Sequence, residues 1–288
     1  MSRKTGIILE GGAMRGIFTA GVMDFYLDKN IDIENVLAVS AGAYAGMNYV
    51  SGQKRRIIDS VVEPMRKEKL LGVSLLFKNG EFFNMEALFD RIPRYDCPFD
   101  FEAFKNSGKH FITSTTNCLT GEATYFDKFD DFDYFLKVIR TGNSLPLLSK
   151  VAYFDGIPMM DGGMVDAIPV AKALKEGWEK IIVVLTRDSS YRKSRKGDIY
   201  NSKLVKFLYH KYKGLLKAID ERPGIYNESI ETLERLEKEG KAFIYRPPNT
   251  IKLTNNEHDA DVLLKYHQVG YETAEARYDE LMEFLNKE

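Results

Sequence analysis

One serine in this sequence lies in surroundings suited to a nucleophile. Ser40 ends the apolar run "NVLAVS" and is flanked by small residues, with Ala38 two positions before it and Gly42 two positions after it. A serine on a sharp strand-to-helix turn needs small neighbours at those positions, where the usual pattern is G-x-S-x-G. A serine that caps the following helix fits the same segment. Residue types alone leave both interpretations open.

A glycine-rich segment near the amino terminus is the second candidate for chemistry. "LEGGAMRG" places Gly11, Gly12 and Gly16 between an apolar run and an amphipathic one, with Arg15 inside the segment. A strand, a glycine loop and a helix in this order leave backbone N–H groups free to bind negative charge. Such a loop binds a nucleotide phosphate, or stabilises the oxyanion of an attacked carbonyl. A plain turn is the third interpretation.

Nucleotide binding fits this loop less well than oxyanion binding. The G-x-G-x-x-G pattern requires a glycine at position 13, where the sequence has Ala13. The second strand of a dinucleotide-binding unit ends in an acidic residue, and here it ends at Ser40. No G-K-[ST] follows the first glycines. A nucleotide- or phosphate-binding α/β protein using residues 11–16 remains the alternative.

A serine nucleophile needs a base, and the best candidate is an aspartate. Asp161 lies in "MMDGGMVDAIPV", where Gly162 and Gly163 leave little bulk to block its approach to another group. Asp166 competes for the same role, and an ordinary Asp-Gly turn is the simpler interpretation of the segment. We expect surface or structural roles for the four histidines of the chain, which are His110, His210, His258 and His267.

The elements that must position these residues alternate between strand and helix. Apolar runs at residues 6–10 and 31–40 predict strands, each followed by a helical pattern. Residues 180–188 predict the clearest buried strand, because the run of branched apolar residues is continuous. The alternation predicts an α/β fold, a three-layer α/β/α sandwich with a mostly parallel central sheet.

The remaining elements divide the chain into a core and a C-terminal portion. We expect a hairpin at residues 109–127 around Gly121, and a helix over residues 131–142. Further predictions are helices over residues 201–220, 226–241 and 258–287, with a last strand at "AFIYRPP". Residues 1–190 would form the core that carries the motifs, and residues 191–288 a helical portion packed on the same domain.

Composition limits the class of protein. The 288 residues are 44% hydrophobic and 29% charged, and the net charge of −1 provides no overall field for nucleic acid. Cys97 and Cys118 form no CxxC pair, so a disulfide framework or a zinc site is not expected. No run of about 18 apolar residues predicts a membrane span, and the opening "MSRKT" leaves no room for a signal peptide. We expect a cytoplasmic protein; no pattern indicates its oligomeric state.

A basic segment, residues 187–217, has ten Lys or Arg against Asp188 and Asp198. Apolar residues such as Leu204 and Phe207 lie between the basic residues, a pattern that favours peripheral contact with an anionic membrane. A solvated helix packed on the domain through its apolar face fits the same pattern. No stacking-aromatic motif accompanies the charge, so nucleic acid is not an expected partner.

Taken in order, "GGAMRG" (11–16), "AVSAG" (38–42) and "DGG" (161–163) resemble the bacterial branch of the patatin-like phospholipase family. That family has a GGGxRG-type loop, then G-x-S-x-G, then DG[GA], and "GNSLPLLSK" also resembles the family's segment before the aspartate. The resemblance covers residues 5–190. Ala13 and Ala38 replace family glycines, and Glu10 stands where the family often has Asp.

The resemblance implies a serine lipid acyl hydrolase that cleaves a lipid or ester substrate with a Ser-Asp dyad. Ser40 would be the nucleophile and Asp161 the general base, with no metal or organic cofactor. The oxyanion would bind backbone N–H groups of Gly12 and Ala13, with Gly11, and Arg15 would help to set the loop. Alanine keeps its N–H, so both replacements are compatible with this hole. A catalytically silent member that binds lipid or a partner is the other alternative.

Overall fold

The computed structural model describes residues 4–196, 198–249 and 253–287, so the ends of the predicted domains and Gly197 of the basic segment lie outside the described residues. The strands are β1 (Thr5–Leu9), β2 (Asn35–Ala38), β3 (His110–Asn117), β4 (Ala123–Phe126), β5 (Ala152–Phe154), β6 (Ile157–Asp161), β7 (Lys180–Val184) and β8 (Ala242–Tyr245). The helices are α1 (Gly16–Asp28), α2 (Ala41–Val50), α3 (Val73–Asn79), α4 (Phe101–Asn106), α5 (Phe132–Gly142), α6 (Val170–Lys175), α7 (Lys203–Leu208), α8 (Lys213–Lys238), α9 (Ala260–Ala276) and α10 (Tyr278–Asn286). Short helical segments are η1 (Ala13–Arg15), η2 (Ile58–Val62), η3 (Pro64–Arg66), η4 (Ala87–Asp96), η5 (Gly162–Met164) and η6 (Ile199–Asn201).

The strands form one sheet in the order β5-β6-β3-β2-β1-β7-β8, with β4 paired to β3. The strands β3, β2, β1, β7 and β8 are parallel to one another, and Ile7 of β1 lies between Val36 of β2 and Ile182 of β7. Within the sheet, the antiparallel pairs are β3–β4, β3–β6 and β5–β6. The prediction of a mostly parallel central sheet is confirmed.

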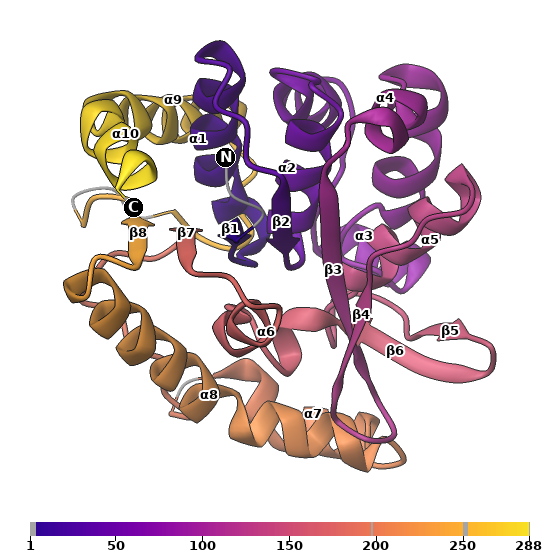
Figure 1. Ribbon diagram of the computed structural model, residues 1–288. Coiled ribbons are helices and arrows are strands. Elements are labelled where there is room, and N and C mark those ends of the chain that lie inside the picture. The colour runs from indigo at the N-terminus through magenta and orange to yellow at the C-terminus, as the bar shows by residue number, and fades with distance from the viewer. Residues whose placement is uncertain (1–3, 197, 250–252, 288) are drawn as a thin grey trace.

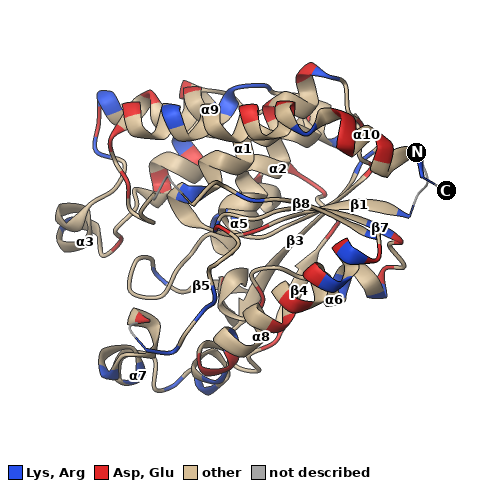
Figure 2. Ribbon diagram, turned by 90° about the vertical axis from the view of Figure 1, so that its left-hand side faces the viewer, with Lys and Arg blue, Asp and Glu red and all other residues tan. Residues whose placement is uncertain are grey.

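Helices cover both faces of this sheet, with α1, α2 and α9 on one side and α6 and α8 on the other (Figures 1 and 2). Side chains alternate along β1. Ile7 and Leu9 therefore pack in the core on the side of α1, α2 and α9, and Ile8 packs in the core on the side of α6 and α8. Both faces of the central strands are therefore buried, as their continuous apolar runs predict. The three-layer α/β/α architecture is confirmed.

The C-terminal portion packs closely against the core. β8 extends the sheet beside β7, and α9 lies against α1. Gly21 and Gly270 permit that approach, since a Cβ on either would collide with a backbone oxygen of the opposite helix, that of His267 or Phe18. The C-terminal portion thus supplies an edge strand as well as helices.

The predicted helix boundaries in the C-terminal portion are wrong in two places. The chain turns at residues 209–212, and α8 then runs through Pro223 without a break, because Leu215, Ile219 and Tyr226 continue one buried face on both sides of the proline. The predicted closing helix divides at Arg277, whose Nη1 donates to the carbonyl oxygen of Ile244 at 2.7 Å. Tertiary contacts therefore outweigh the local signals in both places.

The sheet topology brings the candidate residues to one edge. Gly11 follows β1, Ser40 follows β2 and Thr186 follows β7, so the three lie where the parallel strands have their carboxyl ends. β3 continues past the end of β2, and its residues 115–117 pair with β6. This pairing places Asp161, the last residue of β6, beyond the end of the strand that precedes Ser40.

Candidate active site

Ser40 occupies the turn between β2 and α2. Its backbone angles, φ 54° and ψ −126°, lie outside the regions that a non-glycine residue prefers. Its side chain makes no hydrogen bond to the first turn of α2, so the helix-cap interpretation is wrong. Strained angles of this kind persist where the surrounding structure enforces them. The turn directs the hydroxyl away from its own helix.

The Ser40 hydroxyl reaches Asp161 instead. Ser40 Oγ donates to Asp161 Oδ2 at 2.5 Å, and Asp161 Oδ1 accepts the N–H of Gly163 at 2.7 Å. The backbone of Asp161 is held as well, by Thr116 Oγ1 at 2.8 Å. Burial raises the pKa of the Asp161 carboxyl to about 6, against the opposing effect of these hydrogen bonds. The Asp-Gly turn and the contact with serine therefore occur together.

The competing candidates for a base lie elsewhere. Asp166 accepts the N–H of Ile168 at 3.1 Å, and burial raises the pKa of its carboxyl to about 6. His267 Nε2 lies 2.8 Å from Asp24 Oδ2 in a buried pair on the α1–α9 interface. The other three histidines are exposed. The structure brings only one of these candidates, Asp161, within hydrogen-bond distance of Ser40 in the part of the chain it describes.

The glycine-rich loop lies beside this serine. A Cβ on Gly11 would approach the Ser40 Cβ to 3.0 Å, and one on Gly12 would approach Thr186 Oγ1 to 2.6 Å. Within the described residues, no hydrogen bond is formed by the backbone N–H of Gly11, Gly12 or Ala13. Ala13 has φ 48°, a left-handed value that favours glycine and that accounts for a glycine at this position of the motif. The loop holds free N–H groups next to the serine.

The other small residues act through close packing. A Cβ on Gly42 would collide with the carbonyl oxygen of Leu9, and one on Gly16 would lie 2.7 Å from the Ala41 Cβ. Gly162 packs against Ser114 with the same lack of room. Ala38 is completely buried in β2, next to Gly46 of α2. These contacts let α1 and α2 approach the strand ends on both sides of Ser40.

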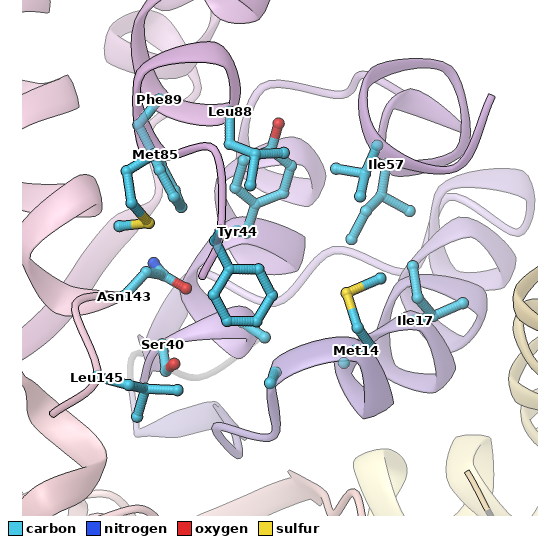
Figure 3. A pocket seen from close by; sticks show the side chains of 15 residues that line it. Met14, Ile17, Ser40, Tyr44, Ile57, Met85, Leu88, Phe89, Asn143 and Leu145 are labelled. Carbon is cyan, nitrogen blue, oxygen red and sulfur yellow. The ribbon is translucent and has the colours of Figure 1, made fainter. Parts of the chain in front are cut away.

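An apolar cavity opens on one side of Ser40 (Figure 3). The space inside it, open mouth included, is about 610 Å³, and Figure 3 shows Ser40 and Ile57 on opposite sides of it. Its side chains come from the start of α1, from α2, and from the irregular helical segments that follow. The apolar cavity is defined here by Met14, Ile17, Tyr44, Ile57, Met85 and Leu88.

A polar cavity of about 490 Å³ opens on the other side of the same serine. Ser40 and Ala13 line both cavities, and Asp161 and Gly163 line the polar one. Arg15, which is expected to help set the loop, also lines this cavity and has only 8% of its surface exposed. The polar cavity is defined here by Glu10, Arg15, Arg187, Lys193, Arg222 and Tyr226.

Sequence patterns missed several of these polar residues. Arg222 Nε donates to the carbonyl oxygen of Gly163 at 2.8 Å, which ties α8 to the loop that carries Asp161. Glu10 Oε2 accepts the backbone N–H of Thr186 at 2.5 Å and its hydroxyl at 3.0 Å, joining the ends of β1 and β7. Thr186 and Arg187 lie near the end of the buried strand predicted at residues 180–188, so their place at the strand end was a usable signal. Nothing local distinguishes Arg222 from its neighbours.

In residues 4–196, 198–249 and 253–287, no group of three or more His, Cys, Asp or Glu side chains is arranged to hold a metal ion. No described helix combines the length and the apolar character that crossing a membrane requires.

Comparison with known families identifies the class of protein. The sequence matches the family described as "Patatin-like phospholipase" over residues 7–174, more than half of the chain. Residues 212–286 match a domain of unknown function, DUF6363. The chain therefore belongs to the patatin-like phospholipase family, and the resemblance seen in its motifs is confirmed.

Individual proteins show more distant similarity. "Uncharacterized protein YjjU" of Escherichia coli (strain K12) is 24% identical over 238 residues, which cover 77% of this chain and 66% of YjjU. The chain thus spans slightly less than two thirds of that relative's length. Among solved structures, VipD from Legionella pneumophila aligns over 97% of this chain and 67% of its own, with 13% identity and a TM-score of 0.49.

Proposed function

We propose that this protein hydrolyses carboxylic esters of lipids, with Ser40 as nucleophile and Asp161 as general base. One observation carries the proposal. Ser40 Oγ donates to Asp161 Oδ2 at 2.5 Å, in a strained turn whose side chain does not cap its helix. The apolar cavity beside Ser40 provides a place for an acyl chain. Membership in the family supports hydrolase chemistry.

In the first half-reaction, which forms an acyl-serine, each residue of the site would have a separate role. Ser40 Oγ attacks the ester carbonyl carbon while Asp161 Oδ2 takes the hydroxyl proton. Negative charge then develops on the carbonyl oxygen, where the free N–H groups of Gly12 and Ala13, with Gly11, can donate. When the carbon–oxygen bond breaks, Asp161 gives its proton to the leaving alcohol, and an acyl-serine remains.

A second half-reaction would release the acid. Water attacks the acyl carbon while Asp161 accepts one of its protons, and the serine oxygen leaves with that proton. A base must be ionised to begin each half. The pKa of Asp161, which burial raises to about 6, keeps the carboxyl ionised at neutral pH and makes it more basic than an ordinary carboxylate.

Turnover of p-nitrophenyl butyrate and of a phospholipid, together with labelling by a fluorophosphonate, tests the proposal. Wild type is expected to turn over ester and to be labelled, and Ser40→Ala to lose both. Ser51→Ala is the matched control, because Ser51 lies at the other end of α2 and its hydroxyl donates to Asn48 O. Full activity in Ser40→Ala would exclude this mechanism. An inactive wild type that binds nucleotide tightly would favour the phosphate-binding alternative.

The proposal extends to the membrane surface where such substrates lie. Part of the basic segment lines the polar cavity, but α7 presents Leu204, Phe207 and Leu208 to solvent, exposed by 56%, 74% and 49%. Lys203 and Lys206 are exposed on the same helix. Figure 2 shows α7 and α3 projecting on the same side of the molecule. Exposed apolar and basic side chains together suit an anionic bilayer.

Sedimentation with vesicles tests this contact. The protein is expected to bind vesicles containing phosphatidylglycerol, and Phe207→Asp to lower the bound fraction severalfold without changing turnover of soluble p-nitrophenyl butyrate. Tyr95→Asp, at an exposed aromatic outside α7, is the control. Equal binding by Phe207→Asp and wild type would contradict the assignment. The cytoplasmic location stays a prediction, supported by two unpaired thiols, Cys97 and Cys118.

A further inference from the structure

The polar cavity beside Ser40 holds an excess of positive charge. Four cationic side chains line it, whereas its carboxylates are Glu10 and Asp161. Both carboxylates are engaged, Glu10 by Thr186 and Asp161 by Ser40 and Gly163. The four cations are Arg15, Arg187, Lys193 and Arg222.

Of the four cations, Arg222 alone forms an ion pair in the described part of the chain. Arg222 forms an ion pair with Asp198 at 3.4 Å, but no ion pair is formed by Arg15, Arg187 or Lys193. Arg15 Nε and Nη1 and Arg187 Nε are buried and lack a hydrogen-bond partner. Native proteins rarely leave buried donors unsatisfied, so these groups point to a ligand that is bound in use.

The electrostatics agree with this interpretation. Burial, together with the neighbouring Arg187, lowers the pKa of Arg15 to about 10, although Glu10 opposes the shift. Burial also lowers the pKa of Lys193 to about 7, with Arg222 adding to the effect. Burial and mutual repulsion both disfavour these charges, and a bound anion would relieve the repulsion.

Aromatic rings hold the cations in place. The Arg187 guanidinium lies 4.4 Å from the centre of the Tyr191 ring, and Lys193 Nζ lies 4.5 Å from that of Tyr226. The loop that carries Lys193 is fixed by Asn227, whose Oδ1 accepts the Lys193 N–H at 2.9 Å. The cations are thus arranged before any ligand arrives, as a binding site requires.

We propose that the polar cavity is a binding site for a phosphate group of the substrate, next to the ester that Ser40 attacks. Several converging cations suit a phosphate monoester better than a single carboxylate, because the phosphate carries nearly two negative charges and three strong acceptor oxygens. The acyl chain then occupies the apolar cavity, and the phosphate lies on the alcohol side of the ester. This assignment rests on the proposed function. It makes Arg187 and Lys193 determinants of substrate choice.

A matched pair of soluble substrates tests the assignment. Wild type is compared on 1-hexanoyl-glycerol 3-phosphate and on 1-hexanoylglycerol, which differ only in the phosphate. The phosphate-bearing ester is expected to have the higher kcat/KM. Arg187→Gln is expected to raise its KM at least tenfold and to change kcat/KM for the uncharged ester less than threefold.

Two further variants test whether the effect requires a positive charge inside the polar cavity or any positive charge nearby. Lys193→Gln should act in the same direction as Arg187→Gln, which keeps the test valid if either variant folds poorly. Arg192→Gln removes an exposed charge that pairs with Glu234, and it should leave both substrates unaffected. Equal effects of Arg187→Gln on both substrates, or no effect on either, would overturn the assignment.

Binding to the Ser40→Ala variant distinguishes the failure of this inference from failure of the proposed function. Thermal stabilisation by 1-hexanoyl-glycerol 3-phosphate, lost in Ser40→Ala/Arg187→Gln, would support the site even if no ester were turned over. Absence of that stabilisation would overturn it. Inorganic phosphate is the second probe: stabilisation by phosphate equal to that by the ester would show a free-phosphate site and overturn the head-group assignment.

Discussion

The two cavities that meet at Ser40 differ in chemistry and in origin. The apolar cavity is built from residues 13–145, all inside the segment that matches the patatin-like phospholipase family. The polar cavity takes Arg187, Lys193, Arg222 and Tyr226 from the chain beyond that segment, and the last two lie in the DUF6363 match. Under the proposed function, the family segment would supply the reaction centre and the acyl site, and the chain beyond it would add selectivity for the other half of the substrate.

Replacing the proposed base should have the largest effect, because the same base would serve every ester, whatever its acyl chain or head group. Asp161→Asn keeps a side chain of the same shape near Ser40 but removes the proton acceptor. We expect kcat to fall at least about 10²-fold on both the phosphate-bearing and the uncharged ester. Steady-state kinetics on the matched pair measure this. A fall restricted to one of the two substrates would mean that Asp161 acts in binding.

Filling the far end of the apolar cavity should change the selectivity for acyl-chain length and leave the polar cavity unaffected. Ile57 lies on the side of the apolar cavity opposite Ser40, so Ile57→Trp should shorten the space for an acyl chain. We expect the ratio of kcat/KM for p-nitrophenyl palmitate over butyrate to fall about 20-fold, with butyrate turnover retained. Ile199→Trp, at an exposed position, is the control. An unchanged ratio would place the acyl chain elsewhere.

The pH dependence should report Asp161 when an uncharged ester is used, since Lys193 then has no anion to bind. With a pKa of about 6, the fraction of ionised Asp161 and therefore kcat/KM should drop to about one tenth at pH 5 and level off above pH 7. Asp166→Asn removes the other buried carboxyl with a pKa of about 6 and should leave the profile unchanged. A profile that instead shifts with Asp166→Asn would reassign the base.

The same carboxyl affects stability with a defined sign. The pKa of Asp161 in the folded state lies above its ordinary value of 3.8, so the folded protein binds the proton more tightly than the unfolded chain. Its contribution to the free energy of unfolding should therefore decrease as pH rises from about 4 to about 6. Asp161→Asn should flatten this part of the curve in denaturant titrations.

The smallest effects are expected at the two alanines that replace family glycines. Ala13 has φ 48°, so Ala13→Gly relieves backbone strain in the folded state. Because glycine also raises the conformational entropy of the unfolded chain, the free energy of unfolding should change by less than about 1 kcal/mol. Ala38 lies in the interior of β2, where Ala38→Gly should destabilise by about 1 kcal/mol. Turnover should change less than threefold in either variant. Denaturant titration and kinetics measure both; a large gain in activity would show that these alanines impair the site.

The sequence alone predicted Ser40 and Asp161 as candidate residues and determined the layers of the fold. Continuous apolar runs predict buried parallel strands, and small residues beside Ser40 and Asp161 mark tight turns, because these requirements are local. The strand order and the pairing of Ser40 with Asp161, 121 residues apart, required the sheet. So did the unbroken helix through Pro223, since a buried face shared with distant segments outweighs one lost hydrogen bond.

Only the tertiary structure decided the polar cavity. Its cations come from the loop after β1, the loop after β7 and α8, and no spacing along the chain shows that they converge. Along the sequence, Arg187 and Lys193 belong to a basic segment that predicts a membrane contact. In the fold, Arg187 and Lys193 line a buried site beside the proposed nucleophile, because the packing of α8 against the sheet turns that part of the segment inward.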